Sequence, residues 1–581
     1  MRYLIQNGMI VDGTGAKRFP GSVLIEGDRI AAVIRQEEQA QGAHEHKSND
    51  AGQIPLAQNQ NNDVVVIDAG GAFITPGFID IHRHGDWKAL TCGDDELLNR
   101  QGITAVVNGN CGLSAAPQAG AHEQETEHFL RSFIGRKPGS GDENITGSAS
   151  GSGRESEAGS GKDPAWLRTD PASSMEQYLS CLRSVKRSVH TGMLAGGGTI
   201  RASVAGYAGE WLSAAQEEQI RQRLQESLDA GALGVSLGMG YDPEFSYDEA
   251  GLVRVLSPLK GRKIPVTVHI RTEGDGAAEA VSEMIRVAQA LEVPLHLSHM
   301  KCIGRRNWRV TCRKELELIR RAREDGLDVT MDTYPYVTGS TQLVHLIPPQ
   351  FQKEGTQALL HDLADVRIRG QITQVLKSPS SVFENIVELA GFENIVPIAM
   401  ASERFAPMEG RSITQMAKDA GQDPYDTLYD ILLEEACECA MLDTYGCEED
   451  LLDYLKDASC SLISDAIYPE GGHCHPRVYD SFPRFLIRYV RERAVFSMEE
   501  AVRKMTSLPA SVFGLDRGVI RPGMPADICV FSLEKIQSHA TFAHPDRMCT
   551  GFDYVFTAGR PCVIKDQWTN TGTGAWLAPE R

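Results

Sequence analysis

The chain lacks long apolar runs and a surplus of basic residues. None of its apolar stretches approaches the ~18 residues of a membrane-spanning helix, and its N-terminus has no charged-then-apolar signal pattern. With 58 Lys and Arg against 78 Asp and Glu, the net charge of -20 would repel phosphate backbones and anionic lipids. We therefore expect a cytoplasmic protein that binds neither nucleic acid nor membranes.

Regularly spaced cysteines and uniform composition are also lacking. The 13 cysteines are odd in number and scattered, which argues against the disulfide framework of a small secreted domain and favours reduced thiols. Residues 36–62 and 136–163 are polar and hold too few apolar side chains to offset the entropy of ordering. Both segments are predicted to be mobile surface insertions, the second of low complexity.

Short apolar segments rich in β-branched residues alternate with amphipathic helices along most of the chain. Eight candidate strands occupy residues 73–82, 103–110, 191–198, 232–239, 263–270, 293–299, 327–334 and 459–465. Near-continuous apolar strands that alternate with helices are typical of a buried parallel sheet. Eight of them predict an α/β fold with a closed (β/α)8, TIM-like barrel.

The two ends of the chain differ from this pattern. Residues 1–72 and 517–581 contain short strands punctuated by Asn-Gly, Gly-Asp and Pro-Gly turns, and together they are predicted to form a small β-sandwich. The barrel would then span residues 73–516. Within it, residues 341–458 form a long excursion between the seventh and eighth strands, which we expect to be a lid or subdomain beside the active site.

Side chains that can bind metal end five of the eight predicted strands. They are His82, His84, Cys111, His269, His299 and Asp465. Strand ends converge at one rim of such a barrel, and alternation sends the side chains of His82 and His84 to the same side. Imidazole and thiolate are ligands that zinc prefers, and a carboxylate can be a further ligand or a proton acceptor. The sequence therefore predicts a metal-dependent active site.

Taken singly, each of these residues has a structural explanation. Cys111 alone is typical of a small buried side chain, and His269 or His299 alone is typical of a hydrogen-bonded core histidine. Their joint position at strand ends favours the metal site, because several such coincidences would be needed otherwise.

These segments resemble those of the amidohydrolase superfamily and, within it, of the N-acyl-D-amino-acid deacylase (D-aminoacylase) family. The superfamily is marked by "PGFIDIHRHGD" and the branch by "GNCG". Further matching segments are "HIRTEGD" (269–275), "LSHMK" (297–301), "DTYPYVTGST" (332–341), "SDA" (464–466), "HPR" (475–477) and "GVIRPGMPADICVF" (518–531). The resemblance covers nearly the whole chain outside the two polar insertions.

The resemblance implies a role for each side chain. It implies a tight Zn²⁺ site of Cys111, His269 and His299, and a second, weaker metal site to which His82 and His84 contribute and which shares the thiolate. It implies that Asp465 is the general base. The substrate carboxylate would be held by Lys301, Tyr334 and Arg477.

The implied reaction is zinc-dependent hydrolysis of the linear amide bond of an N-acyl-D-amino acid, a small molecule, to a carboxylate and a free D-amino acid. The preference for the D form rests on the resemblance alone. Relatives that accept acidic side chains use an arginine after "YPY", and none occurs here from Tyr336 until Arg367. We therefore expect a neutral amino acid side chain. "SDA" for the commoner "SDG", together with Arg83 and Gly85 beside His84, departs from the family pattern and could change the support of the weaker site.

Two alternatives stay open. One is a hydrolase of cyclic amides in the same superfamily, similar to dihydroorotase or hydantoinase. Such enzymes usually hold their metals with a lysine carbamate, so Cys111 and the "HPR" segment argue against it. The other is a metal-binding barrel without catalytic activity, which the intact ligands and Asp465 argue against.

Overall fold

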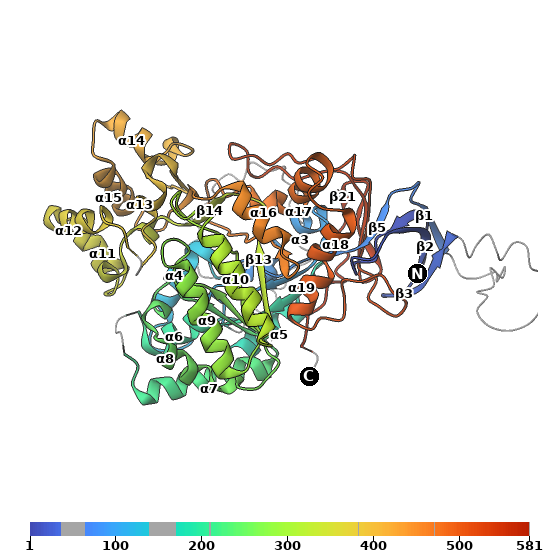
Figure 1. The fold of residues 1–581 in the computed structure, drawn as a ribbon, viewed down its shortest axis with the longest axis horizontal. Coiled ribbons are helices and arrows are strands. Elements are labelled where there is room, and N and C mark those ends of the chain that lie inside the picture. The colour runs from blue at the N-terminus through green and yellow to red at the C-terminus, as the bar shows by residue number, and fades with distance from the viewer. Residues whose placement is uncertain (37–63, 139–169, 208–210, 381–382, 470, 580–581) are drawn as a thin grey trace, which may run out of the picture.

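Eight parallel strands at the centre of the molecule form a barrel. The computed structural model describes residues 1–36, 64–138, 170–207, 211–380, 383–469 and 471–579, so the two predicted insertions lie almost entirely outside the described residues. In Figure 1 the barrel lies between a sheet built from both chain ends and the excursion that carries α11 to α15.

Each predicted strand segment contributes to the barrel. The strands are β6 (Phe78–Asp80), β7 (Ile103–Asn108), β8 (His190–Met193) with its continuation β9 (Ala195–Gly196), β10 (Val235–Gly238), β11 (Val266–His269), β12 (Leu295–Leu297), β13 (Val329–Thr333) and β17 (Cys460–Leu462). They pair in parallel in the orders β6-β7-β8 and β9-β10-β11-β12-β13-β17. A parallel bridge from Arg83 to Ala466 joins the two ends, which closes the ring.

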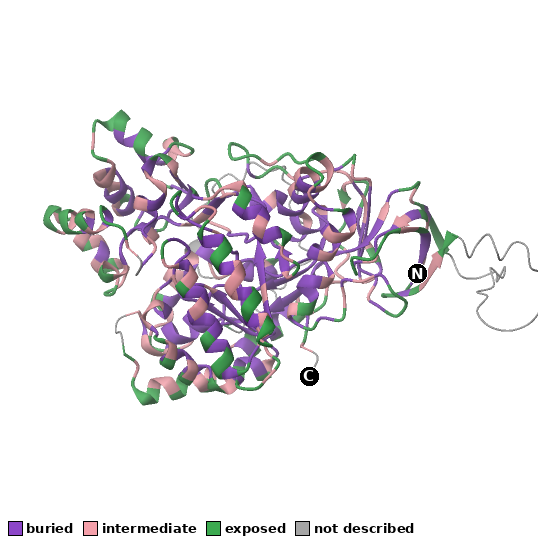
Figure 2. Cartoon of the chain, viewed as in Figure 1, coloured by how far each residue is buried: buried purple, intermediate pink, exposed green. Residues whose placement is uncertain are grey.

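Helices cover the outside of the barrel because each has one apolar face. In α9 (Ala277–Leu291), apolar residues at helical spacing are buried, among them Val281, Met284 and Ala288, whereas Glu279 and Arg286 are exposed. Figure 2 shows the same division, with buried residues inside and exposed residues on the outer helix surfaces. The other helices of this layer are α2 (Asp86–Thr91), α3 (Asp95–Arg100), α4 (Glu123–Ile134), α5 (Met175–Ser184), α6 (Gly197–Ala205), α7 (Ala214–Ala230), α8 (Glu249–Val255), α10 (Thr311–Glu324), α16 (Glu448–Lys456), α17 (Arg477–Phe485), α18 (Met498–Met505) and α19 (Ser507–Val512).

Both chain ends build one nine-stranded sheet. From the N-terminal side come β1 (Arg2–Ile10), β2 (Phe19–Glu26), β3 (Arg29–Arg35), β4 (Val64–Asp68) and β5 (Phe73–Pro76), and from the C-terminal side β18 (Ile528–Phe531), β19 (Phe552–Thr557), β20 (Arg560–Ile564) and β21 (Gln567–Trp568). The ring of Tyr3 in β1 lies 5.2 Å from that of Phe556 in β19, although β5 and β18 separate these strands in the sheet. The sheet therefore curls around a shared core, as a sandwich does.

The first predicted strand, 73–82, is divided in the structure. Residues 73–76 pair with β18 and β1 in the terminal sheet, and the barrel strand starts at Phe78. Between them, Gly77 passes so close to the neighbouring strand that a Cβ there would lie 2.2 Å from Oγ1 of Thr104. This close approach marks the point where the chain leaves one sheet for the other.

The excursion between β13 and β17 has a sheet and a hydrophobic core of its own. Its strands β14 (Thr338–Gln342), β16 (Ala440–Thr444) and β15 (Ile395–Ile398) pair antiparallel. Its helices are α11 (Thr356–Leu363), α12 (Val366–Leu376), α13 (Ile386–Ala390), α14 (Ile413–Ala420) and α15 (Pro424–Glu434). Among all the helices described, none is long and apolar enough to cross a membrane.

Candidate active site

A cavity opens at the carboxyl ends of the barrel strands, where strand-end side chains converge. It is lined by eight of the nine residues predicted for the site: His84, Cys111, His269, His299, Lys301, Tyr334, Asp465 and Arg477, the last from the start of α17. His82 is the one predicted residue that does not line it, because it lies beneath the cavity and is fully buried.

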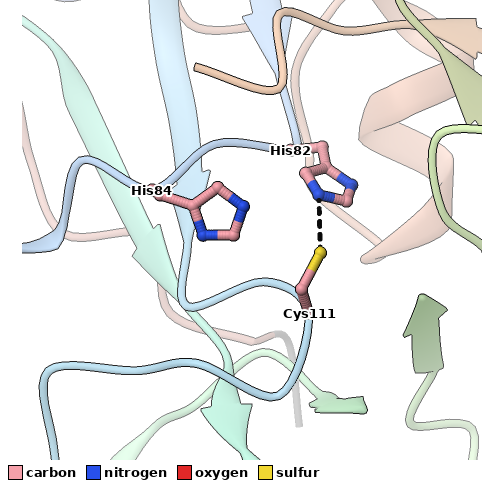
Figure 3. Close-up of side chains that lie close together, drawn as sticks. All are labelled: His82, His84 and Cys111. Atoms are coloured by element: carbon pink, nitrogen blue, oxygen red, sulfur yellow. Dashed lines mark hydrogen bonds between the residues drawn. The ribbon is translucent and has the colours of Figure 1, made fainter. Parts of the chain in front are cut away.

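Cys111 occupies a sharp turn directly after β7, where its backbone adopts a left-handed conformation with φ +55°. Its Sγ lies 3.2 Å from Nε2 of His82 and 3.4 Å from Nε2 of His299. Figure 3 shows the sulfur pointing at the ring of His82, with His84 beside them. The turn therefore brings the thiol of the second strand between imidazoles of the first and sixth.

The sulfur of Cys111 belongs to two clusters of possible metal ligands. One is His82, His84 and Cys111, and the other is Cys111, His269 and His299; within each, the ligand atoms all lie within 4.8 Å of one another. One sulfur and two imidazole nitrogens form a donor set suited to zinc. The arrangement therefore fits a metal in either cluster, with the thiolate common to both.

The charges of the site favour the ionised form of Cys111. Burial opposes ionisation, but the positive charges of His82 and His299 hold the pKa of this thiol well below its ordinary value. Metals bind the thiolate rather than the thiol. The ionised sulfur therefore favours the binding of a metal cation in this cluster.

Asp332, in β13, supports the cluster from below and was not identified from the sequence. Its Oδ2 lies 3.3 Å from Nδ1 of His82 and 2.8 Å from Nε2 of His296. A carboxylate on Nδ1 fixes the imidazole so that Nε2 faces the sulfur. Its position in an apolar strand, two residues before Tyr334, is the one sequence feature that could have indicated it, since an aspartate within a buried apolar strand is unusual.

Arg83, which departs from the family pattern, is buried between the two histidines of the His-x-His segment. Its Nη2 lies 3.0 Å from Oδ2 of Asp94, and it also contacts the hydroxyl of Tyr468. Asp94 in turn lies 2.9 Å from Arg187. This ionic network holds the backbone that carries His82 and His84.

Asp465 faces both histidines of that segment. Its Oδ1 lies 3.5 Å from Nε2 of His82 and 3.5 Å from Nε2 of His84. Burial opposes ionisation, but Arg477 and the hydrogen bond to His84 hold the pKa of this carboxyl well below its ordinary value. The carboxylate of Asp465 is therefore ionised and lies beside both histidines.

Lys301, Tyr334 and Arg477 gather at one side of the cavity, as the resemblance implies. The guanidinium of Arg477 lies 4.7 Å from the ring centroid of Tyr334, and Nζ of Lys301 lies 5.9 Å from it. Lys301 also forms an ion pair with Glu273, with 2.5 Å between Nζ and Oε1. Glu273 lies in the matched segment "HIRTEGD", but the sequence assigned it no role.

Arg477 keeps one donor without an acceptor among the described residues. Its Nη2 donates to the carbonyl of Ser340 and its Nη1 lies 3.0 Å from Oδ2 of Asp465, whereas Nε is buried without a hydrogen bond. A buried donor without an acceptor costs free energy, which a ligand oxygen can recover. This part of the cavity therefore suits an anionic group of the substrate.

Apolar and aromatic side chains also line the cavity, some of them from the excursion. They include Phe129, Phe133, Tyr241, Ile347 and Ile467. His345 from the excursion stacks on Tyr241, with 4.4 Å between the ring centroids. Residues of the excursion thus lie directly beside the barrel rim that holds the polar cluster.

Known proteins share this chain's sequence and fold over nearly its full length. The model of the Amidohydrolase family matches residues 456–563, which include Asp465 and Arg477. An N-acyl-D-glutamate deacylase of Alcaligenes xylosoxydans xylosoxydans is 28% identical over 97% of this chain and 93% of its own length, and a D-aminoacylase of the same organism is 28% identical over 99% and 97%.

Solved structures of such deacylases have a fold similar to that of this chain. The N-acyl-D-glutamate deacylase of Bordetella bronchiseptica, complexed with zinc and a phosphonate inhibitor, superposes with a TM-score of 0.74 at 26% identity and covers 99% of both chains. By contrast, similarity to a dihydroorotase of Lactobacillus helveticus covers 9% of this chain and 13% of that protein. The chain is therefore similar over nearly its full length to N-acyl-D-amino-acid deacylases, and its C-terminal part matches the Amidohydrolase family.

Proposed function

We propose that this chain hydrolyses the amide bond of N-acyl-D-amino acids and releases a carboxylate and a free D-amino acid. The observation that carries the proposal is the sharing of one thiolate, Cys111, by two histidine pairs directly beside an ionised Asp465. Full-length similarity to deacylases of N-acyl-D-amino acids supports the same reaction and the D form of the substrate.

The donor set assigns the metal ligands. Cys111, His269 and His299 would hold a tightly bound zinc ion, and His82 and His84 would complete a second, weaker site through the same sulfur. Zinc in such a site acts as a Lewis acid that polarises an amide carbonyl and makes water a stronger acid.

Asp465 is the proton-transfer group of the proposed reaction. Its ionised carboxylate accepts a proton from the attacking water and later delivers it to the leaving nitrogen. The two histidines at 3.5 Å and Arg477 at 3.0 Å hold the carboxylate in one orientation during these transfers. No other carboxylate of the described residues contacts both His82 and His84.

Arg477, Lys301 and Tyr334 bind the α-carboxylate of the substrate. The free Nε of Arg477 can donate a hydrogen bond to one of its oxygens, and Lys301 adds positive charge while it stays paired with Glu273. The α-carboxylate then lies next to Asp465, which places the adjacent amide within reach of the general base.

A hydrolase of cyclic amides is the alternative of the same superfamily. By the resemblance, Cys111 stands in for the lysine carbamate that such enzymes usually carry, and the free Nε donor of Arg477 suits the carboxylate of an open-chain substrate. The second alternative is a metal-binding barrel without activity. It does not explain why an ionised carboxylate, Asp465, lies beside the donor set.

One experiment separates these functions. Turnover is measured with N-acetyl-D and N-acetyl-L forms of the same amino acids and with a cyclic imide, together with the zinc content of the same preparation. Hydrolysis of the D forms is the expected result. Turnover of the imide alone would replace the proposal with the first alternative, and bound zinc without turnover of any compound would replace it with the second.

A further inference from the structure

Most charged side chains that line the cavity are paired. Lys301 pairs with Glu273, Arg477 with Asp465, and Arg271 with Glu283. Asp443 and Glu384, like Asp242, have no ion-pair partner within 4.0 Å in the described part of the chain. The cavity therefore holds carboxyl groups that the protein does not neutralise when they are ionised.

Asp443 is buried, with 4% of its surface exposed, and lies in β16 opposite Gly339 of β14. A Cβ at position 339 would lie 2.8 Å from Oδ1 of Asp443, so the glycine leaves room for the carboxyl group. Within the described ranges no other residue donates a hydrogen bond to this carboxyl. Burial raises its pKa to about 7, although the charge of Lys301 acts in the opposite direction.

Glu384 lines the same cavity just before α13. Its Oε2 accepts the backbone N–H of Glu273, but Oε1 is buried without a hydrogen-bond partner. Burial raises its pKa to about 8, with Glu273 contributing further negative charge. Two carboxylates from the excursion therefore lie near the Lys301–Glu273 pair, and each lacks a partner for at least one oxygen.

Substrate binding changes the charge around these two groups. Lys301 and Arg477 are the cations that act on Asp443, and each is already paired with a carboxylate, so the α-carboxylate of the substrate weakens their effect on Asp443 further. A buried carboxylate without a counterion is costly, and a cationic group within the same enclosure removes that cost. An uncharged substrate side chain therefore favours the protonated forms of Asp443 and Glu384, whereas a basic side chain favours their ionised forms and pairs with them.

We propose that Asp443 and Glu384 form a subsite for a cationic side chain, so that the preferred substrates are N-acyl derivatives of basic D-amino acids with a terminal guanidinium or ammonium group. The inference rests on the proposed deacylase function. The missing arginine between Tyr336 and Arg367 excludes an acidic side chain but does not separate a neutral one from a basic one. Side chains of the excursion, which the sequence did not place, make that distinction.

The test compares N-acetyl-D-arginine with N-acetyl-D-citrulline, which have nearly the same shape and differ in charge. The zinc-loaded protein is expected to show kcat/KM at least about tenfold higher for the arginine compound. In Asp443→Asn and Glu384→Gln the ratio of the two kcat/KM values should fall toward one. The matched control is Asp419→Asn, which removes the same charge from an exposed position of the excursion and should keep the wild-type ratio.

Equal or faster hydrolysis of the citrulline compound would overturn the subsite and support a neutral side chain. A high ratio that neither Asp443→Asn nor Glu384→Gln lowers would overturn the assignment to these two residues. If Asp443→Asn does not fold, the wild-type ratio and Glu384→Gln decide. Failure of the deacylase function itself is distinguishable, because then N-acetyl-D-citrulline and N-acetyl-D-methionine are not hydrolysed either.

Discussion

Arg477 and Asp465 form an ion pair inside the cavity, with 3.0 Å between Nη1 and Oδ2. The pair joins the first residue of α17 to the end of the last barrel strand. It gives Arg477 two connected functions, since the same guanidinium orients the proposed general base and offers its free Nε donor to the substrate carboxylate. Substitutions at the two ends of the pair should therefore have different kinetic signatures.

Arg477→Lys should raise KM more than it lowers kcat. Lysine keeps the positive charge beside Asp465 but cannot make the two-pronged contact of a guanidinium with a carboxylate. We expect kcat/KM for an N-acetyl-D-amino acid to fall about 10- to 100-fold, mainly through KM. Steady-state kinetics check this, and an unchanged KM would remove Arg477 from the carboxylate subsite.

Asp465→Asn should retain zinc and lose turnover. An asparagine preserves the shape of the side chain but cannot accept the proton, so kcat should fall about 100-fold or more. Zinc content by mass spectrometry is the control, because a loss of metal would explain the defect without any role in proton transfer. Turnover near the wild-type value would contradict the assignment of the general base.

Cys111→Ala should remove zinc and activity together. The thiolate is the only ligand common to both three-residue clusters, so its loss leaves two imidazoles in each. Metal affinity should fall by at least about 100-fold, which equilibrium dialysis can measure. A variant that keeps its zinc would place Cys111 outside the metal site.

Gly112→Ala should disturb the turn that carries Cys111. Gly112 has φ +73°, and a Cβ there would lie 2.0 Å from Oε2 of Glu244 and 2.7 Å from the backbone nitrogen of Gly238. The control is Gly261→Ala, because Gly261 has φ +71° but has no atom within 4 Å of an added Cβ.

Both substitutions force an alanine into a left-handed backbone conformation, which lowers the free energy of unfolding by about 1 kcal/mol in each variant. Only Gly112→Ala should in addition lose zinc and show a larger drop in apparent Tm. Equal losses of Tm and equal zinc content in the two variants would show that the close packing around Gly112 does not position Cys111.

The strand positions and the strand-end ligands could be predicted from the sequence because both depend on local patterns. An apolar strand ends where polar residues begin, and His269 or Cys111 stands at that point. Asp332 could not be predicted in its role, because its partner His82 is 250 residues away and the contact exists only in the closed ring.

The cavity residues of the excursion could not be predicted from the sequence either. Nothing in its composition indicates that Asp443 and Glu384 line the cavity, since their position depends on how β14 and β16 pack against the barrel rim. The division of the first strand at Gly77 could not be predicted from the sequence. The apolar pattern continues through the glycine, although the chain passes there from one sheet to the other.

Glu315 in α10 should make the stability of the protein depend on pH. It is fully buried, accepts hydrogen bonds from Tyr454 and Cys302, and burial raises its pKa to about 8. The folded state therefore binds this proton more tightly than the unfolded state, whose pKa is the ordinary value near 4.5. The stabilisation is fully present below about pH 4.5 and is lost as pH rises toward 8, by roughly 1.4 kcal/mol for each pH unit.

Glu315→Gln imitates the protonated side chain, so its apparent Tm should exceed that of the wild type by a margin that widens from pH 5.5 to pH 8. All other titrating groups are common to both proteins, and the difference in Tm therefore isolates Glu315. The control is Glu317→Gln on the same helix, where hydrogen bonds from Arg320 and Arg321 lower the pKa of Glu317 to about 2. That carboxylate is ionised in both states throughout this range, so its margin should stay constant, and a constant margin for Glu315→Gln as well would contradict the buried, protonated state.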